Sequence, residues 1–216
     1  MHTQRMFSLV GAGLIVGAVA TEASAVVTNP FTETFATSDS NWKNSAMTAP
    51  TYDAAGQFIS VSATVTGAQQ GLFRAQDAFS SSNNNFVGNW LSAGISEIRF
   101  SIRHDAPTAL QFAMRVAVPA NSPAISAISN PVEPGAWRDV VLPLTPGTVS
   151  QEGGSFNGVM SDAAKLLLFM PSGNASTTGP VTFQLDNVSI TPEPGTLGLL
   201  GLTALGCLAR RRARRA

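Results

Sequence analysis

Hydrophobic and polar residues alternate along three segments of this chain, residues 59–66, 98–103 and 110–118. Successive side chains of a β-strand point to opposite faces, so a period of two is typical of a strand with one buried face. Other short hydrophobic segments predict further strands, at residues 31–35, 71–74, 137–144, 165–170 and 181–190. Gly, Pro, Asn and Asp cluster at residues 53–56, 105–107, 133–135 and 172–174. These clusters predict turns between the strands.

Long helices are not expected between residues 26 and 190, because no long stretch there repeats hydrophobic residues at helical spacing. Residues 162–165 predict one helical turn. About eight strands without long helices favour an all-β fold, an antiparallel β-sandwich of the jelly-roll type. About 165 residues are enough for one domain with a full core.

The last predicted strand changes phase part-way along. Hydrophobic residues occupy the first, third and fifth positions of residues 181–185, whereas Val188 and Ile190 lie in the other phase. A β-bulge near Asp186 and Asn187 would bring both groups to the same face. The alternative is a strand that is covered on both faces.

The first 25 residues have the pattern of a secretory signal peptide. Arg5 supplies the positive start, residues 6–20 are apolar, and residues 23–25 form an A-x-A cleavage site. The mature chain is then expected to begin at Val26. An uncleaved N-terminal anchor is the alternative.

The last 26 residues, 191–216, combine a short motif, an uncharged run and a basic end. Residues 195–209 contain no charge, and as a helix they would reach about 22 Å, against about 30 Å for a hydrocarbon core. Arginine side chains that extend to the interface, and local thinning of the bilayer, can make up this difference. The arginines should stay in the cytoplasm. The alternative, a buried amphipathic helix with a basic tail, would need more polar positions at helical spacing.

This C-terminal segment resembles the PEP-CTERM sorting signal of bacterial secreted proteins. The matching residues are Pro192, Glu193, Pro194, the Gly/Leu-rich run, and the basic cluster that includes Arg210, Arg211 and Arg212. The resemblance implies a transmembrane sorting helix that holds the protein briefly in the membrane. It also implies exosortase, a membrane cysteine protease, as the processing partner, and delivery to the cell surface or outside the cell.

Charge and cysteine content narrow the classes of function. Residues 26–190 contain seven Lys/Arg and eleven Asp/Glu, a formal net charge of −4. A weakly acidic domain argues against nucleic acid and anionic membrane surfaces as partners. The single cysteine, Cys207, lies in the C-terminal run. Disulfides, thiol catalysis and cysteine metal sites are therefore excluded from residues 26–190.

Four segments resemble jelly-roll modules of the galactose-binding and carbohydrate-binding type. They are residues 86–100, 135–138, 141–144 and 183–190, and the laminin IV-type module has a similar Phe-x-Gly segment. Such modules often hold a structural calcium between the first and last strands. The resemblance implies Glu33 and Asp186 as its carboxylate ligands, the oxygen donors that Ca²⁺ prefers. The alternative is an exposed glutamate and a capped aspartate.

Catalytic chemistry finds little support in residues 26–190. His104 is the one histidine there, and the adjacent Asp105 would point to the opposite side of a strand. We expect His104 at the surface or in a turn. A G-x-S-x-G motif and the ligands of a zinc site are missing from the sequence. Eleven carboxylates leave glycosidase chemistry open, but no local motif selects a pair. We predict that the protein is not an enzyme.

Carbohydrate binding requires an aromatic platform beside polar groups. Trp42 lies among Ser, Asn and Lys and is expected to be exposed, and Trp90 follows a Gly-Asn turn at a loop rim. We therefore predict Trp42 and Trp90 as ligand-binding residues, with Tyr52 next. Trp137 begins an apolar strand and is expected in the core.

Together these features predict an exported cell-surface or matrix protein with a structural or interaction role linked to exopolysaccharide or biofilm. Its expected partners are exosortase, the membrane through the C-terminal helix, and an extracellular polysaccharide or matrix protein. A carbohydrate-binding module is the second interpretation, and a small glycan-active enzyme is the third.

Overall fold

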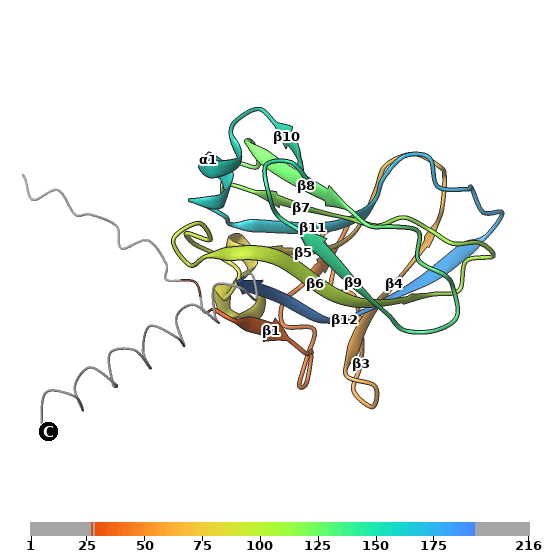
Figure 1. Ribbon diagram of the computed structural model, residues 1–216. Helices are drawn as coiled ribbons and strands as arrows, with labels where there is room; N and C mark the ends of the chain where they lie inside the picture. The colour runs from red at the N-terminus through yellow and green to blue at the C-terminus, as the bar shows by residue number, and fades with distance from the viewer. Residues whose placement is uncertain (1–26, 28, 193–216) are drawn as a thin grey trace, which may run out of the picture.

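Two antiparallel sheets form the protein, as the computed structural model shows for Val27 and residues 29–192 (Figure 1). Sheet A has the strand order β3-β4-β12-β6-β9, with β1 also paired to β12, and sheet B has the order β10-β8-β7-β11-β5-β2. Sheet A consists of β1 (Phe31–Glu33), β3 (Thr51–Asp53), β4 (Phe58–Thr64), β6 (Ile95–His104), β9 (Arg138–Pro143) and β12 (Pro180–Pro192). Sheet B consists of β2 (Lys43–Asn44), β5 (Gln70–Gln76), β7 (Ala113–Ala117), β8 (Ala124–Ile128), β10 (Ser150–Glu152) and β11 (Lys165–Met170). The predicted all-β antiparallel sandwich is confirmed.

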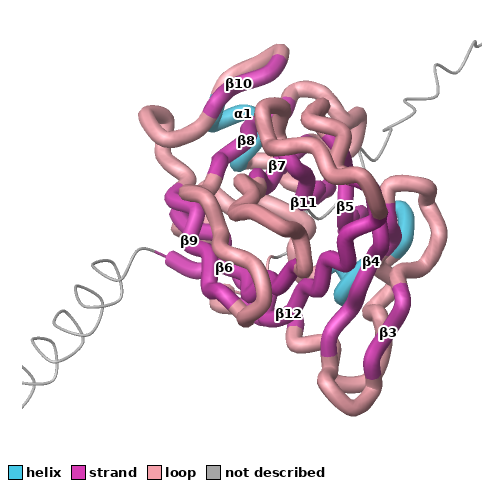
Figure 2. The backbone as a smooth tube through the Cα atoms, turned by 90° about the vertical axis from the view of Figure 1, so that its right-hand side faces the viewer, coloured by secondary structure: helices cyan, strands magenta, loops and turns pink. Residues whose placement is uncertain are grey.

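The two sheets face each other, with sheet B above sheet A in Figure 1, and the hairpin of β3 and β4 extends from one end in Figures 1 and 2. Side chains of alternate residues from both layers meet in one core. Phe100 and Phe183 contribute to it from sheet A, and Phe73 and Leu168 contribute from sheet B. The described members of this core run from Val27 to Ile190, and a chain of about 165 residues is long enough for one domain with a full core, so a fragment of residues 26–192 is expected to fold.

The strongly alternating segments became strands close to the predicted bounds, and β11 matches its predicted range. The segment 110–118 is strand only over β7, because Leu110 forms an isolated bridge with Val132 before it. The short strands β2, β3, β8 and β10 were not predicted, since two to five residues carry too little periodicity.

The predicted helical turn is in the wrong place. The one α-helix among the described residues is α1 (Phe156–Met160), which begins where the Ser155 hydroxyl accepts a hydrogen bond of 3.1 Å from the Gly158 amide. The other helical segments are two 3₁₀ turns, Asp77–Phe79 and Ser81–Asn84. Within residues 27 and 29–192, no helix has the length and apolar character that crossing a membrane requires.

The predicted bulge in the last strand is confirmed. The pairing of β12 with β6 shifts register between Asp186 and Ser189, and Asn187 has a φ of 51°. The extra residue reverses the phase of the strand, so Leu185 before the bulge and Val188 after it both enter the core.

The signal peptide (residues 1–25), Glu193, Pro194 and the C-terminal arginines lie outside the described residues. Pro192, the first residue of the predicted motif, is the last residue of β12.

The left-handed backbone at Asn187 leads to a stability prediction. We expect Asn187→Val to lower the free energy of unfolding of residues 26–192 by about 1–2 kcal/mol more than Asn187→Gly does, because a β-branched residue is strained at positive φ whereas glycine is not. Urea unfolding of both variants measures this difference. Equal destabilisation by valine and glycine would show that the bulge does not depend on the left-handed residue.

Candidate functional site

The prediction that Trp42 and Trp90 form a ligand platform is wrong. Both indoles are 0% exposed. The Trp42 ring stands edge-on to Phe35 at 5.6 Å, and its Nε1 donates to Ser82 Oγ at 2.8 Å. The Trp90 Nε1 donates to the carbonyl oxygen of Phe86 at 2.9 Å. Each tryptophan therefore belongs to the core, with its one donor satisfied.

The polar sequence around Trp42 misled the prediction because the chain turns there. The preceding residues Ser40 and Asn41 both have a positive φ, which directs the backbone around a tight corner. Asn41 is exposed and Ser40 is half-buried, while the indole of Trp42 is directed inward. The polar residues around Trp42 therefore indicated a turn, and they did not indicate that the tryptophan is exposed.

Trp137, which the sequence placed in the core, is the exposed tryptophan. Its side chain is 36% exposed and lies just before β9. Val140 and Leu142 of β9 point into the core, so the opposite phase, to which Trp137 belongs, faces outward. The phase of this strand was visible in the sequence and would have placed the indole on the outer face of sheet A.

Two neighbours fix the orientation of the Trp137 ring. The ring of Phe58 meets it edge-on with centroids 5.6 Å apart, and the Arg103 guanidinium lies 5.1 Å from its centroid. The same guanidinium lies 5.8 Å from the centroid of Phe58, and its Nε donates to Gln184 Oε1. Cation–π and edge-to-face contacts each contribute about 0.5–2 kcal/mol. The indole is therefore both exposed and held in place.

A polar hollow of about 300 Å³ adjoins this cluster on the outer face of sheet A. Its lining residues come from β6, the loop after it, the loop before β9, and β12: Arg103, His104, Asp105, Gly135, Thr182 and Gln184. The Asp105 carboxylate accepts a hydrogen bond of 2.7 Å from the Thr182 amide. Guanidinium, carboxamide, carboxylate and hydroxyl groups thus surround the hollow beside an aromatic ring, the combination that orients a small polar ligand.

His104 is buried, contrary to the prediction of a surface or turn position. It is 1% exposed, and its ring lies 5.6 Å from that of Phe112. Its Nε2 is 3.0 Å from the Val132 carbonyl oxygen, and its own carbonyl oxygen accepts a 2.8 Å hydrogen bond from the Gly135 amide. Two hydrogen bonds therefore tie the loop before Trp137 to the end of β6.

Burial lowers the pKa of His104 below its ordinary value of 6.5, although the hydrogen bond to Val132 and the charges of Asp105 and Glu133 act to raise it. A carbonyl oxygen can only accept, so Nε2 carries the proton of the neutral ring. Within the described part of the chain, Nδ1 is buried without a hydrogen-bond partner. His104 is thus a neutral structural anchor of this loop.

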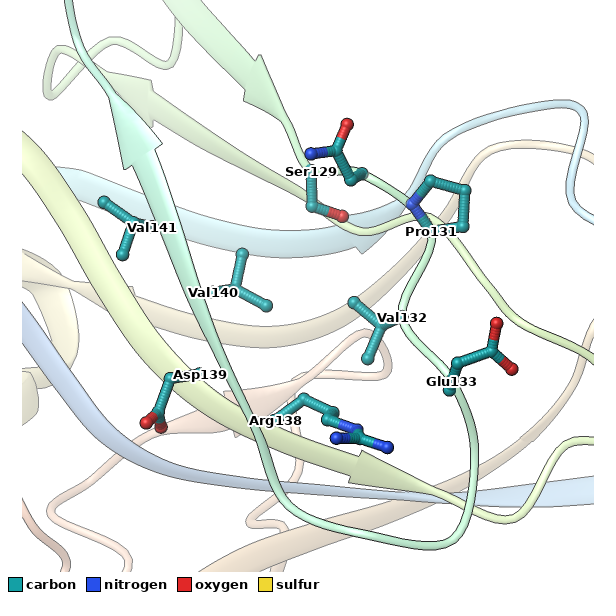
Figure 3. Close-up of a pocket in the computed structure, with 9 residues that line it drawn as sticks. Ser129, Pro131, Val132, Glu133, Arg138, Asp139, Val140 and Val141 are labelled. Atoms are coloured by element: carbon teal, nitrogen blue, oxygen red, sulfur yellow. The ribbon is translucent and has the colours of Figure 1, made fainter.

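A second hollow, of about 280 Å³, lies where the same loop passes the edge strand β9 (Figure 3). Figure 3 shows Val132 and Val140 facing each other across it, with Glu133 and Arg138 towards one end. Residues of both phases of β9 line this hollow, Arg138 and Val140 as well as Asp139 and Val141, so it lies along the edge of the strand.

Pairing of the first and last strands of sheet A brings Glu33 and Asp186 together. Glu33 is opposite Val188, two residues beyond Asp186. Burial raises the pKa of Asp186, the hydrogen bond from the Asn187 amide opposes this rise, and the charge of Glu33 adds to it. The Glu33 carboxylate accepts a 2.9 Å hydrogen bond from the Phe35 amide. In residues 27 and 29–192, no three His, Cys, Asp or Glu side chains gather as metal ligands, and the calcium site stays a prediction.

The C-terminal segment is identified by its sequence. Residues 191–215 match the family model of the PEP-CTERM protein-sorting motif. The chain carries a PEP-CTERM sorting signal. This signal marks exported proteins that exosortase sorts to the cell surface, and it starts within the last two residues of β12, directly where the sandwich ends.

Two solved agarase structures share the fold of the sandwich. An exo-β-agarase is 13% identical, with 77% of this chain and 26% of that chain covered and a TM-score of 0.51. The agarase AgWH50C is 11% identical, with 71% and 23% covered and a TM-score of 0.50. This chain spans about a quarter of the length of each agarase. The family 11 carbohydrate-binding module of Clostridium thermocellum Lic26A-Cel5E is 12% identical, with 78% and 97% covered and a TM-score of 0.46. No curated protein sequence matches the chain.

The buried neutral His104 predicts a pH dependence of stability. Its pKa is lower in the folded protein than in the unfolded chain, so at pH values just below 6.5 the unfolded chain binds more protons. The contribution of His104 is thus fully present above pH 6.5 and is lost as the pH falls below it. We expect the free energy of unfolding to be lower at pH 5.5 than at pH 7.5, by at most about 1.4 kcal/mol from this group.

Urea unfolding of wild type and His104→Gln at both pH values measures this contribution. Glutamine does not titrate, so the variant should show a smaller pH difference than the wild type. If both proteins lose the same stability between pH 7.5 and 5.5, His104 is not the group responsible.

Proposed function

We propose that this protein is a non-catalytic surface protein that binds a neutral polysaccharide through Trp137 on the outer face of sheet A. Its sorting signal accounts for export and for handling by exosortase. After a brief stay in the membrane, the sandwich is released to the cell surface or the matrix. There it links the cell to exopolysaccharide, which gives it a role in biofilm.

The observation that carries this proposal is the exposed, immobilised indole of Trp137. A pyranose ring presents an apolar face of C–H groups, which stacks on an aromatic ring, and hydroxyl groups at its edge. Because Arg103 and Phe58 already hold the indole, stacking a sugar on it orders no further large side chain. The hollow beside it offers Asp105, Thr182 and Gln184 to the hydroxyl groups.

The polar groups of the hollow favour binding of a ligand over catalysis. The carboxylate that lines the hollow, Asp105, accepts a hydrogen bond from the backbone amide of Thr182. His104 lines the same hollow, but its ring is buried in the core and bound to the Val132 carbonyl. These are structural roles, and they leave the hollow suited to hold hydroxyl groups.

The test is binding of a panel of neutral polysaccharides, including agarose, xylan and a soluble β-glucan, by affinity electrophoresis of residues 26–192. We expect Trp137→Ala to weaken binding at least tenfold, about 1.4 kcal/mol, because it removes the stacking surface. Trp137→Phe keeps an aromatic ring and should retain part of the affinity.

The matched control is Val141→Ala, which trims a 43% exposed side chain of β9 on the same outer face. It should bind like the wild type. Unchanged binding by Trp137→Ala, or absence of binding to every polysaccharide of the panel, would contradict the proposed function.

We also propose that Glu33 and Asp186 hold a structural calcium ion between β1 and β12. Two carboxylates lie close enough there for the charge of one to raise the pKa of the other, and a cation would relieve this repulsion. Backbone carbonyls and water would have to complete the coordination. The ion would stabilise the fold next to the point where the sorting signal begins.

Removal of calcium tests this second proposal. At a calcium concentration a hundred times its dissociation constant, binding adds about 2.7 kcal/mol, which corresponds to about 5–10 °C in melting temperature for a domain of this size. EDTA should lower the melting temperature of the wild type by that amount. Asp186→Asn should melt at the same temperature with and without EDTA, while Asp139→Asn, on the same sheet, should respond like the wild type. A wild-type melting temperature unaffected by EDTA would remove Glu33 and Asp186 from the metal site.

A further inference from the structure

The charged residues divide unevenly between the two sheets. The strands of sheet A contain three arginines and five acidic residues, whereas those of sheet B contain four basic residues and one acidic residue. The basic residues of sheet B are Lys43, Arg74, Arg115 and Lys165, and its acidic residue is Glu152. An acidic domain thus has one basic sheet.

Strand register places these basic residues on the same face of sheet B. Lys43 of β2 is opposite Arg74 of β5. Leu167 of β11 is opposite Arg74 on one side and opposite Arg115 of β7 on the other. Lys165 is two residues before Leu167 and shares its face. Neighbouring residues of the other phase, among them Phe73, Leu166 and Val116, lie in the core. The basic residues therefore lie on the outer face, and we call them the sheet B basic row.

The row crosses four neighbouring strands, from β2 to β7. Neighbouring strands are about 4.8 Å apart, so Lys43 and Arg115, separated by three strand spacings, are about 14 Å apart. Basic groups separated by this distance cannot all contact one small anion. It matches a chain molecule whose charges repeat along its length.

Arg74 and Lys165 form no ion pair among the described residues. The two ion pairs among the described residues are Arg99–Glu97 and Arg115–Glu152. Arg115 also donates to Asn121, and the Lys43 ammonium lies 5.9 Å from the centre of the Phe79 ring. In the described part of the chain, by contrast, Arg74 Nε is buried without a hydrogen-bond acceptor. A buried donor without an acceptor is unfavourable, so the Arg74 side chain gains a hydrogen bond if it turns outward to an anionic ligand.

We propose that the sheet B basic row binds an acidic polysaccharide that bears carboxylate groups. Arginine binds a carboxylate through two parallel N–H donors, and lysine adds a point charge. Nucleic acid is disfavoured because base stacking needs open aromatic rings, and the two rings beside the row are covered or partly covered. Phe169, the aromatic residue of β11 on this face, is 5% exposed, and Phe79, which lies beside the Lys43 ammonium, is half-buried. The proposal rests on the proposed function in taking the sandwich as a glycan-binding domain, but it uses the opposite face and a different ligand chemistry.

Binding of polygalacturonate to residues 26–192 tests this proposal, measured by biolayer interferometry at 25 and 150 mM NaCl. The double variant Arg74→Gln/Lys165→Gln removes the two unpaired charges. The control Arg99→Gln/Arg138→Gln makes the same change in net charge on sheet A. We expect at least a tenfold loss of affinity for the first variant, less than twofold for the control, and weaker wild-type binding at 150 mM NaCl. Arg74→Lys keeps the charge and should recover only part of the affinity, because lysine lacks the paired donors.

Equal loss in the two double variants, or no binding of polygalacturonate at 25 mM NaCl, would overturn the proposal. Tighter binding to phosphatidylglycerol vesicles or to single-stranded DNA, with the same dependence on Arg74 and Lys165, would also overturn it and assign the row to another class of polyanion. Near-UV circular dichroism of each variant identifies any loss of the fold. The neutral-polysaccharide assay on the same samples separates a failure at Trp137 from a failure at the basic row.

Discussion

The pairing of β12 is the constraint on which the rest of the structure depends. This strand lies in the middle of sheet A and pairs with β6 on one side and with β4 and β1 on the other. The bulge at Asn187 lets both halves of the strand bury hydrophobic side chains in the same core. The same strand supplies Gln184 to the aromatic cluster and Asp186 to the predicted calcium site, and it ends at Pro192, where the sorting signal starts.

The candidate glycan site is assembled from segments that are far apart in the sequence. The loop that carries Trp137 is held to the end of β6 by the two hydrogen bonds of His104. The ring itself is held by Arg103 and Phe58. Each contact is weak, but together they restrain the indole before any ligand arrives. Preorganisation of this kind raises affinity because less freedom is lost on binding.

The two outer faces of the sandwich differ in chemistry. The outer face of sheet A presents an aromatic ring with polar neighbours, and that of sheet B presents a row of basic side chains. A surface protein with two such faces is able to contact two kinds of polymer at once, and joining two modest contacts raises the overall avidity. A net charge of −4 for residues 26–190 conceals this arrangement, because a sum carries no information on position.

Local sequence by itself determined the strands with clear alternation, the bulge next to Asn187 and the sorting signal, since each depends on residues that are neighbours in the chain. It did not determine which side chains are covered. Trp42 and His104 are buried, and Trp137 is exposed, because segments distant in the sequence cover the first two and leave the third open. Alternation states which residues of a strand share a face. The packing of one sheet on the other decides which face is exposed to solvent. The register between strands decides which charged side chains lie next to one another on that face.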